Sequence, residues 1–386
     1  MVPTFITRRR VAALTVAFAL VAAACGGDDD DPVATGQPEA ATEEEATSEC
    51  FSDPGLEPID ISDVDLASLA GTTLKMVAYD SFFVSDGIFD SFEAETGITV
   101  EILTSADTGT MVSEAVLTVG DPVADVMWGI DNTFLCRGLE NDIFTPYESA
   151  LLDTVDDELK LDEYLRVTPV DFSDLCINYW TDALDGPPPE SIADLAEEQY
   201  ASTFVTENPE TSAPGMGFLL STIAEFGEGG WQDYWTQLAD NGVAVTPGWS
   251  EAYYGEFIAG GGDRAIVMSY ASSPVAELLF ADPPVDVPPT EALLDSCFRS
   301  IEFAGVLAGT DHPEASALLI DFLLSPTFQE DIPLNMFIFP ANSEAQLPPE
   351  FVEWAPLTTS PFTLAPDVIE ANRDAWTEEW TEIVLR

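Results

Sequence analysis

Short apolar segments alternate with amphipathic segments along this chain, and this alternation constrains the fold more than any other feature. Three early segments have the β-branched and apolar content of strands: 73–79, 98–103 and 124–129. Between them, 90–97 and 112–119 have the pattern of helices, and the first of these ends at Gly97. Strands that alternate with helices at this spacing predict an α/β domain with a largely parallel sheet.

The same pattern resumes in the rest of the chain. Two further strands are predicted at 175–179 and 264–270. Helices are predicted at 191–196, 218–226, 231–239, 314–324 and 368–384, and the acid- and proline-rich segment 282–289 is predicted to be a surface loop. About 310 residues follow the N-terminal region, which is enough for two lobes of ordinary size.

The N-terminus has the pattern of an export signal. Arg8, Arg9 and Arg10 precede an uncharged run, Val11–Ala24, which is shorter than a normal membrane-spanning helix. The run ends in three alanines and Cys25, which resembles the lipobox of bacterial lipoproteins, where the cysteine is lipidated. We therefore expect a signal peptide over 1–24; the alternative is an ordinary signal with a chance cysteine. The arginines also loosely match a twin-arginine signal.

The segment after Cys25 supports an anchor. Residues 25–49 are rich in Gly, Asp, Glu, Ala and Thr and lack aromatic residues, so they predict a disordered acidic tether. No later segment has the pattern of a transmembrane helix, so anchoring would depend on the lipid at Cys25. The sequence predicts an exported protein held at the outer face of the cytoplasmic membrane or in the periplasm.

The charge balance limits the possible partners. The chain has 71 acidic and 11 basic residues and a formal net charge of −60. Such a surface argues against nucleic acid and anionic lipid headgroups as direct partners. It favours solubility in a saline habitat first and attraction of a cationic ligand second.

Four cysteines remain after Cys25, an even number that predicts disulfides in an exported protein. Three pairings are possible. We favour Cys136–Cys176, which leaves Cys50 to pair with Cys297.

Motifs for catalysis are lacking. The single histidine, His312, precedes a proline and a predicted helix, and no Cys/His spacing suits zinc. There is no Gly-x-Ser-x-Gly elbow, and Gly260–Gly262 is not followed by the Lys-Ser/Thr of a P-loop. We expect no cofactor, no metal site and no enzymatic activity.

Aromatic and hydroxyl side chains gather where predicted strands meet loops. The four segments are 79–82, 211–215, 248–253 and 269–274. Ligands of α/β folds bind beyond the carboxyl ends of the strands, and π faces with hydroxyls suit a flat cationic heterocycle. The alternative is that Trp249 and Tyr270 are core aromatics.

These segments, in this order, resemble the periplasmic thiamine-binding proteins of ABC importers. The matching runs are Tyr-Asp-Ser-Phe from Tyr79, Ala124–Asn132, Thr-Ser-Ala-Pro-Gly-Met-Gly from Thr211, Gly-Trp-Ser-Glu-Ala-Tyr from Gly248, Ser269–Pro274, Phe322–Gln329, Ile332-Pro333, and Trp376 with Trp380. The resemblance covers residue 73 to the end and depends on the collinear set.

The resemblance implies a type 2 periplasmic-binding fold of two lobes that close on a ligand between them. Each lobe would have a mixed, mostly parallel sheet. We expect an N-terminal extension over 50–72, a first lobe over 73–170 and 269–386, and a second lobe over 171–268. Crossing strands would be Cys176–Tyr179 and Ala265–Tyr270.

The family's ligand contacts fall on ten positions of this chain. They are Asp107, Thr108, Gly109, Ser212, Ala213, Trp249, Tyr270, Ala271, Ser272 and Ser273. Trp249 and Tyr270 would offer π faces, the serines would bind a phosphate or hydroxyethyl tail, and Tyr79 would line the cleft.

Some positions depart from the family. Asp86-Gly87 and Phe337 stand where relatives often have tryptophan. Thr108 stands where well-known relatives have an acid, unless Asp107 takes that part. The preferred ligand therefore stays open among thiamine, its monophosphate and its diphosphate. The implied partners are this ligand and an ABC permease, and we expect a monomer.

Two alternatives share the fold. A thiaminase I-type enzyme needs an activated cysteine, and Cys136 is better used in a disulfide. A receptor for iron would use clustered tyrosines, for which Tyr253-Tyr254 is the available pair, and a polyamine receptor would use acids and aromatics.

Overall fold

The computed structural model describes residues 50–386. The predicted signal peptide over 1–24, the lipidated Cys25 and the tether over 25–49 lie outside the described residues. Within 50–386, no helix has both the length and the apolar character needed to span a membrane.

The described residues form one ten-stranded sheet. Its main path runs β2-β1-β3-β9-β5-β8-β6-β7, while β4 pairs with β9 and β10 pairs with β5. The strands are β1 (Thr73–Ala78), β2 (Thr99–Thr104), β3 (Val126–Asp131), β4 (Phe144–Thr145), β5 (Thr168–Trp180), β6 (Phe204–Glu207), β7 (Ala244–Thr246), β8 (Ile266–Tyr270), β9 (Thr290–Leu307) and β10 (Phe339–Pro340).

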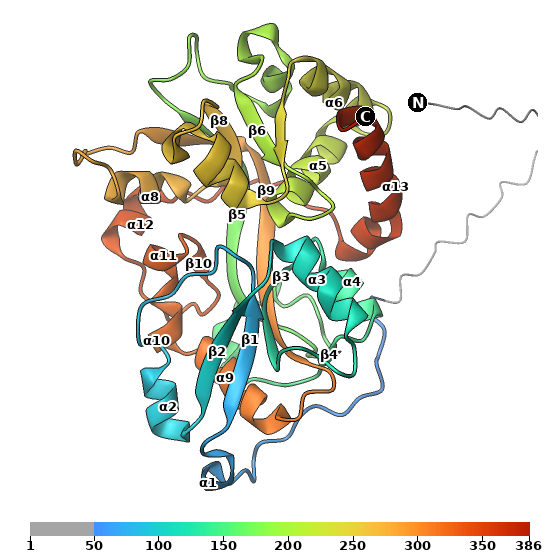
Figure 1. Cartoon of the computed structure of the whole chain (residues 1–386), viewed down its shortest axis with the longest axis vertical. Helices are drawn as coiled ribbons and strands as arrows, with labels where there is room; N and C mark the ends of the chain where they lie inside the picture. Colours follow the sequence, from blue (N-terminus) through green and yellow to red (C-terminus); the bar gives the residue numbers. More distant parts are fainter. Residues whose placement is uncertain (1–49) are drawn as a thin grey trace, which may run out of the picture. The chain divides into compact units, whose positions relative to one another are not determined.

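The sheet is parallel at its two ends and antiparallel in its middle. β1 pairs in parallel with β2 and β3, and β6 pairs in parallel with β7 and β8. The long strands β5 and β9 pair antiparallel with each other and join the two ends (Figure 1). This mixed arrangement confirms the predicted α/β fold class.

The sequence misplaces the second long crossing strand. It is expected at Ala265–Tyr270, but β8 has only five residues and pairs with β5 and β6. Instead, β9 has 18 residues and pairs with β3 at one end of the sheet and β5 along its length. No strand is predicted there, because Arg299 and Glu302 interrupt its apolar pattern.

Helices flank the sheet. They are α1 (Leu66–Leu69), α2 (Asp90–Thr96), α3 (Thr108–Leu117), α4 (Leu135–Glu140), α5 (Ala213–Phe226), α6 (Gly230–Asp240), α7 (Trp249–Glu251), α8 (Ser273–Leu279), α9 (Pro313–Leu323), α10 (Pro326–Gln329), α11 (Ile332–Asn335), α12 (Pro349–Trp354) and α13 (Pro366–Val384). The predicted segment 191–196 is a 3-10 turn whose Ser191 cap forms a capping box with Asp194.

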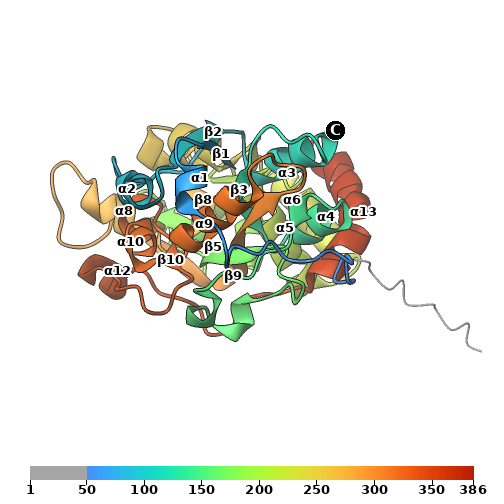
Figure 2. The same cartoon turned by 90° about the horizontal axis from the view of Figure 1, so that it is seen from below.

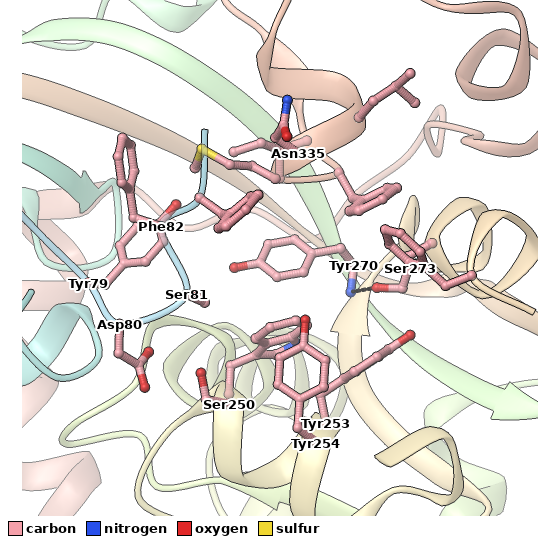
Figure 3. Close-up of a pocket in the computed structure, with 18 residues that line it drawn as sticks. Tyr79, Asp80, Ser81, Phe82, Ser250, Tyr253, Tyr254, Tyr270, Ser273 and Asn335 are labelled. Atoms are coloured by element: carbon pink, nitrogen blue, oxygen red, sulfur yellow. Dashed lines mark hydrogen bonds between the residues drawn. The ribbon is translucent and has the colours of Figure 1, made fainter. Parts of the chain in front are cut away.

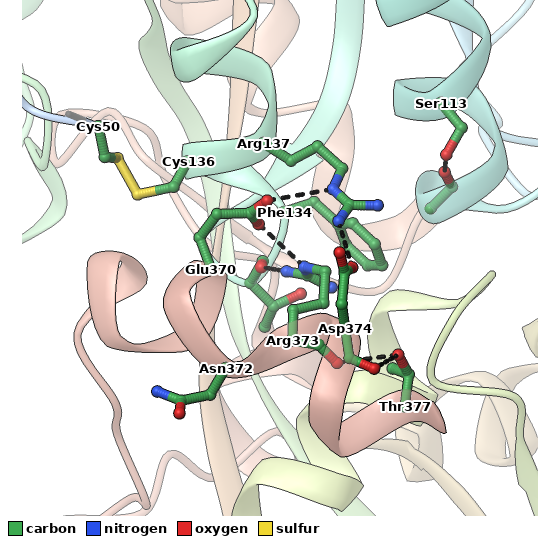
Figure 4. Close-up of polar contacts among 12 residues, drawn as sticks. Cys50, Ser113, Phe134, Cys136, Arg137, Glu370, Asn372, Arg373, Asp374 and Thr377 are labelled. Atoms are coloured by element: carbon green, nitrogen blue, oxygen red, sulfur yellow. Dashed lines mark hydrogen bonds and ion pairs between the residues drawn. A yellow bond between two sulfur atoms is a disulfide. The ribbon is translucent and has the colours of Figure 1, made fainter. Parts of the chain in front are cut away.

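The C-terminal helix α13 ties the two ends of the sheet together. It lies beside α4 and α6 in both views (Figure 1 and Figure 2). Trp380 of α13 is fully buried, with its ring 5.4 Å from that of Trp235 in α6. At α4, the Arg373 guanidinium lies 4.2 Å from the Phe134 ring centroid, and Arg137 pairs with Glu370 of α13 (Figure 4).

Two disulfides are present among the described residues, and the predicted pairing is wrong. Cys50 bonds to Cys136 (Figure 4), and Cys176 bonds to Cys297. The second bond joins β5 to β9, the neighbouring strands in the middle of the sheet, and the first fixes the start of the folded chain to α4. Neither pairing was readable from spacing, because the bonded cysteines are 86 and 121 residues apart.

Candidate functional site

A cavity of about 500 Å³ lies among segments from both ends of the sheet. This volume is in the usual range for small-molecule sites. It is lined by Tyr79, Asp80, Ser81, Phe82, Phe83, Trp249, Ser250, Tyr253, Tyr254, Tyr270, Ser273, Ala276, Phe280, Leu334, Asn335, Met336, Phe337 and Ile338 (Figure 3). Phe83, Tyr254 and Phe280 are more than half exposed, so the cavity opens to solvent past them.

One wall of the cavity is a group of four aromatic rings. The Trp249 ring stacks on Tyr253, with centroids 4.8 Å apart, and meets Tyr254 and Tyr270 edge to face at 5.3 and 6.0 Å. Such contacts hold each ring in one orientation and present π faces to a ligand. A cation placed over these faces would be attracted by their quadrupoles.

Hydrogen bonds fix Trp249 at the start of α7. Its indole Nε1 donates to Ser269 Oγ at 2.9 Å, and Ser269 Oγ lies 2.8 Å from Ser273 Oγ. Its backbone N–H donates to Asp107 Oδ2 at 2.9 Å. The indole is therefore placed from two sides before any ligand arrives, which lowers the ordering cost of binding.

Tyr79 faces the aromatic wall from the end of β1. Its hydroxyl donates to Glu302 Oε2 at 2.9 Å. A Cβ at Gly129 would lie 2.3 Å from the Tyr79 ring, and Gly129 has a φ of +95°, so only glycine fits beneath this tyrosine. Figure 3 shows the Tyr79 and Tyr270 rings on facing sides of the hollow.

The electrostatics of the cavity favour a positive ligand. None of its lining residues is Lys, Arg or His, while Asp80 lies on its surface. Burial raises the pKa of Asp80, against a hydrogen bond from Ser250. Behind the wall, Glu277 accepts a 2.8 Å hydrogen bond from Tyr253, and burial raises the pKa of Glu277 as well. Because burial disfavours the ionised form of these carboxyls, a cation bound nearby would stabilise that form.

Three of the ten predicted ligand positions line the cavity: Trp249, Tyr270 and Ser273. Tyr79, which was predicted to line the cleft, does so as well. Five others gather behind Trp249, where the start of α3 meets the start of α5. They are Asp107, Thr108, Gly109, Ser212 and Ala213. The Gly109 N–H donates to the Thr211 carbonyl at 3.0 Å, which joins these segments directly.

Asp107 caps this contact. Its Oδ1 accepts the Thr108 N–H at 2.7 Å, while its Oδ2 accepts the N–H of Trp249. Burial raises the pKa of Asp107, although these hydrogen bonds oppose the rise. Asp107 therefore positions Trp249 and does not itself line the cavity.

The remaining two predicted residues also lie outside the cavity lining. Ala271 is fully buried and packs against the Cys176–Cys297 disulfide. The Ser272 hydroxyl donates to the Phe337 carbonyl, which fixes the position of the next wall. In both cases the backbone turn after β8 is what positions Ser273 at the cavity.

Sequence reasoning missed part of the lining. Ala276, Phe280 and the segment 334–338 are brought to the cavity by the fold. Ser250 and Tyr253 lie in the predicted segment 248–253, whereas Tyr254 was predicted only as part of a candidate iron pair and belongs to the aromatic wall. Phe337, noted only as a departure from a family tryptophan, does line the cavity.

The residues described offer no metal site. No group of three His, Cys, Asp or Glu side chains within 50–386 has the geometry to hold a metal ion. The cavity itself is lined by the aromatic wall and one carboxylate, Asp80.

Comparison with known proteins identifies the family. Residues 121–362 match the model described as bacterial extracellular solute-binding protein. The thiamine-binding periplasmic protein of Salmonella typhimurium is 29% identical over 83% of this chain and 95% of its own length.

Solved structures show the same fold. A periplasmic thiamin binding protein has a TM-score of 0.71 at 26% identity, covering 81% of this chain and 96% of its own. Iron-bound HitA from Pseudomonas aeruginosa, at 18% identity, covers 81% of this chain and 99% of its own with a TM-score of 0.66. These likenesses confirm the predicted resemblance to thiamine-binding proteins and the type 2 periplasmic-binding fold.

The family model covers more than half of the chain, and it agrees with a cavity built for binding. The predicted role in solute capture, in place of catalysis, is confirmed by this family. The chain belongs to the bacterial extracellular solute-binding proteins.

Proposed function

We propose that this protein is a lipid-anchored receptor that captures thiamine outside the cytoplasmic membrane and delivers it to an ABC import permease. The observation that carries the proposal is the aromatic wall around Trp249 in a cavity without a cationic lining residue. The curated relatives of the chain are thiamine-binding proteins, which supports the same ligand.

The chemistry of thiamine fits this cavity. Its thiazolium ring carries a fixed positive charge, and both of its rings are flat. Trp249 and Tyr270 would stack on or edge against these rings, and Asp80 would offset the charge. Hydroxyls of Ser250 and Ser273 would bind the amino or hydroxyethyl group. Thiamine monophosphate and diphosphate remain candidate ligands through the same rings.

Titration calorimetry with the chain from residue 25 onward, carrying Cys25→Ala, tests the ligand. We expect one-to-one binding of thiamine and a loss of at least about a hundredfold in affinity in Trp249→Ala. Trp354→Ala is the matched control, because Trp354 lies in a separate groove beside Ala271 and Pro356 and should bind as the parent does. Absence of heat with thiamine and both phosphates, from folded protein, would overturn the ligand.

The anchor has its own test. We expect the native chain to fractionate with membranes and to incorporate a labelled fatty acid. Cys25→Ala should remove both properties while binding stays unchanged. Export of unlabelled, unanchored native protein would contradict the anchor and leave thiamine capture intact.

Capture also calls for motion between two lobes. We propose that the first lobe, 73–170 with 269–386, and the second lobe, 171–268, move toward each other when thiamine binds. The strands β5 and β9 would act as the hinge. The cavity is lined from both sides of these strands, so ligand contacts would hold the sides together. Small-angle X-ray scattering should show a smaller radius of gyration with thiamine, and an unchanged radius would contradict lobe closure.

A further inference from the structure

Three carboxyl groups lie side by side across the middle of the sheet. Glu302 of β9 is the register partner of Asp131 in β3 and of Asp171 in β5. Cross-strand partners project from the same face of a sheet, so the three side chains form a row. We call Asp131, Glu302 and Asp171 the acid row.

The acid row is buried and has no arginine partner in direct contact. The three residues are 0%, 4% and 1% exposed. Oδ1 of Asp131 accepts from Thr133 Oγ1 at 2.9 Å and from the Phe134 N–H at 3.2 Å. By contrast, Asp131 Oδ2 and Asp171 Oδ2 accept no hydrogen bond from residues 50–386. Buried carboxylates without partners are costly, so these atoms call for an explanation.

The groups that face the row are mostly acidic or phenolic. Tyr79 donates to Glu302, Tyr270 approaches from β8, and Asp107 approaches from α3. Arg373 of α13 is the cation on the Asp131 side, but it pairs with Glu370 at 3.0 Å. Among the described residues, Arg373 is thus the cation that offsets the charge of the row, and it is shared with Glu370.

Protons offset the remaining charge. Burial is the main cause that raises the pKa of Glu302 and of Asp171 well above the usual range. Repulsion from Asp171 raises the pKa of Glu302 further, whereas a hydrogen bond with Glu302 opposes the rise at Asp171. Burial also raises the pKa of Asp131 to about 6. Two buried carboxyls that face each other in this way hold a proton more tightly than isolated carboxyls do.

The row connects to the cavity through two of its lining residues. Tyr79 lines the cavity with its ring and holds Glu302 with its hydroxyl. Tyr270 lines the facing side, and the charges of Glu302 and Asp171 are among those that raise the pKa of its hydroxyl, after burial. A cation between these rings would thus lie one side chain away from the row.

We propose that the acid row is the counter-charge for the cationic ligand and that ligand binding expels a proton from it. The inference rests on the proposed capture of thiamine and adds its charge balance. In the step, the O–H bond of one row carboxyl breaks, its electron pair stays on the carboxylate, and the proton passes to buffer. The fixed thiazolium charge takes the place of that proton.

The proposed charge balance also predicts that the site distinguishes ligands by their charge. A flat neutral ligand gains from the aromatic wall but gives the row no reason to ionise. Thiochrome, a neutral tricycle made from thiamine, should therefore bind at least about tenfold more weakly and release no proton. Thiamine binding should weaken as pH falls, because the protonated row resists ionisation.

Calorimetry in two buffers tests the inference. Thiamine is titrated into the Cys25→Ala chain near neutral pH in phosphate and in Tris, whose ionisation enthalpies differ. We expect a heat difference that corresponds to about half to one proton released per thiamine. Glu302→Gln, which keeps an oxygen for the Tyr79 hydroxyl, should abolish the difference and weaken binding by about tenfold.

A matched control and a second variant make the outcomes decisive. Glu101→Gln changes an exposed glutamate of β2 and should release the same proton as the parent. If Glu302→Gln does not fold, Asp171→Asn serves in its place. Thiamine binding with identical heats in both buffers, or unchanged release in the row variants, would overturn the inference. Failure of thiamine to bind at all would instead overturn the proposed function.

Discussion

Buried acids of two kinds occur in this protein, and their surroundings differ. Asp162 and Asp174 each face an arginine: Arg166 Nη2 lies 2.7 Å from Asp162 Oδ1, and Arg299 Nε lies 2.6 Å from Asp174 Oδ1. The acid row of Asp131, Glu302 and Asp171 lies as deep in the sheet without such a partner. The two kinds thus differ in whether an arginine offsets the buried charge.

The difference is most direct within β5 itself. Asp171 and Asp174 are three residues apart on one strand, and both are fully buried. Asp174 accepts from Arg299 and from the Thr358 N–H at 2.7 Å, whereas Asp171 faces Glu302. Burial alone therefore does not distinguish these acids; the absence of an arginine partner and the link through Tyr79 to the cavity set the acid row apart.

The largest effect should come from breaking an arginine-paired acid. Arg166→Ala leaves the Asp162 carboxylate buried without a cation and also removes the bond to the Cys50 carbonyl. We expect the free energy of unfolding to fall by about 3–5 kcal/mol, measured by urea unfolding with the disulfides intact.

A double variant separates charge from packing at this pair. Asp162→Asn with Arg166→Met removes both charges and keeps most of the volume, so it should recover more than half of the lost stability. If the double variant loses as much unfolding free energy as Arg166→Ala, the pair stabilises the fold through its packing and not through its charges. The contrast with the acid row would then no longer hold.

A smaller effect should follow from the pH dependence of Asp131. Its pKa is raised to about 6 from 3.8, so between these values the folded protein holds a proton that the unfolded chain releases. Stability is then highest below this window and falls as pH rises through it, by up to about 3 kcal/mol.

Asp131→Asn isolates this contribution. The amide keeps an oxygen for the Thr133 and Phe134 bonds but cannot ionise. We expect the variant to lose most of the decline in unfolding free energy between about pH 4 and 6. The exposed variant Asp121→Asn should decline as the parent does, and a parallel decline in Asp131→Asn would contradict the assignment.

A third prediction compares the two acids of β5, whose substitutions should change the stability in opposite directions. Asp171→Asn removes a buried carboxyl whose Oδ2 has no hydrogen-bond partner among the described residues, so the ligand-free protein should gain about 1–2 kcal/mol at neutral pH. Asp174→Asn should instead lose stability, because Arg299 then lacks its carboxylate. Thermal unfolding of both variants checks this, and a loss in both would show that the two acids play the same structural part.

The elements that the sequence predicted are those with a local signal. The strands β1, β2 and β3 and the helices α6, α9 and α13 follow apolar periodicity and lie within a few residues of the predicted bounds. Helix α5 ends where predicted but begins five residues earlier, at Ala213. Trp249 and Tyr270 were found because aromatic residues beside glycine or serine at strand ends are conspicuous.

The features that the sequence did not predict depend on contacts between segments that are distant in the chain. β9 was missed because Arg299 and Glu302 read as surface residues, although in the fold one pairs with Asp174 and the other joins the acid row. The disulfides and the segment 334–338 of the cavity likewise come from chain crossings that no local pattern records.

The smallest effect should come from an acid that is paired but not buried. Arg386 Nη1 lies 2.9 Å from Glu382 Oε1 on α13, and both side chains are more than half exposed. Water and salt screen this pair, so Glu382→Gln should change the free energy of unfolding by less than about 0.5 kcal/mol. Urea unfolding at low and high salt measures it beside Arg166→Ala. A loss as large as that of Arg166→Ala would mean that pairing matters regardless of burial, and unpaired burial would then no longer single out the acid row.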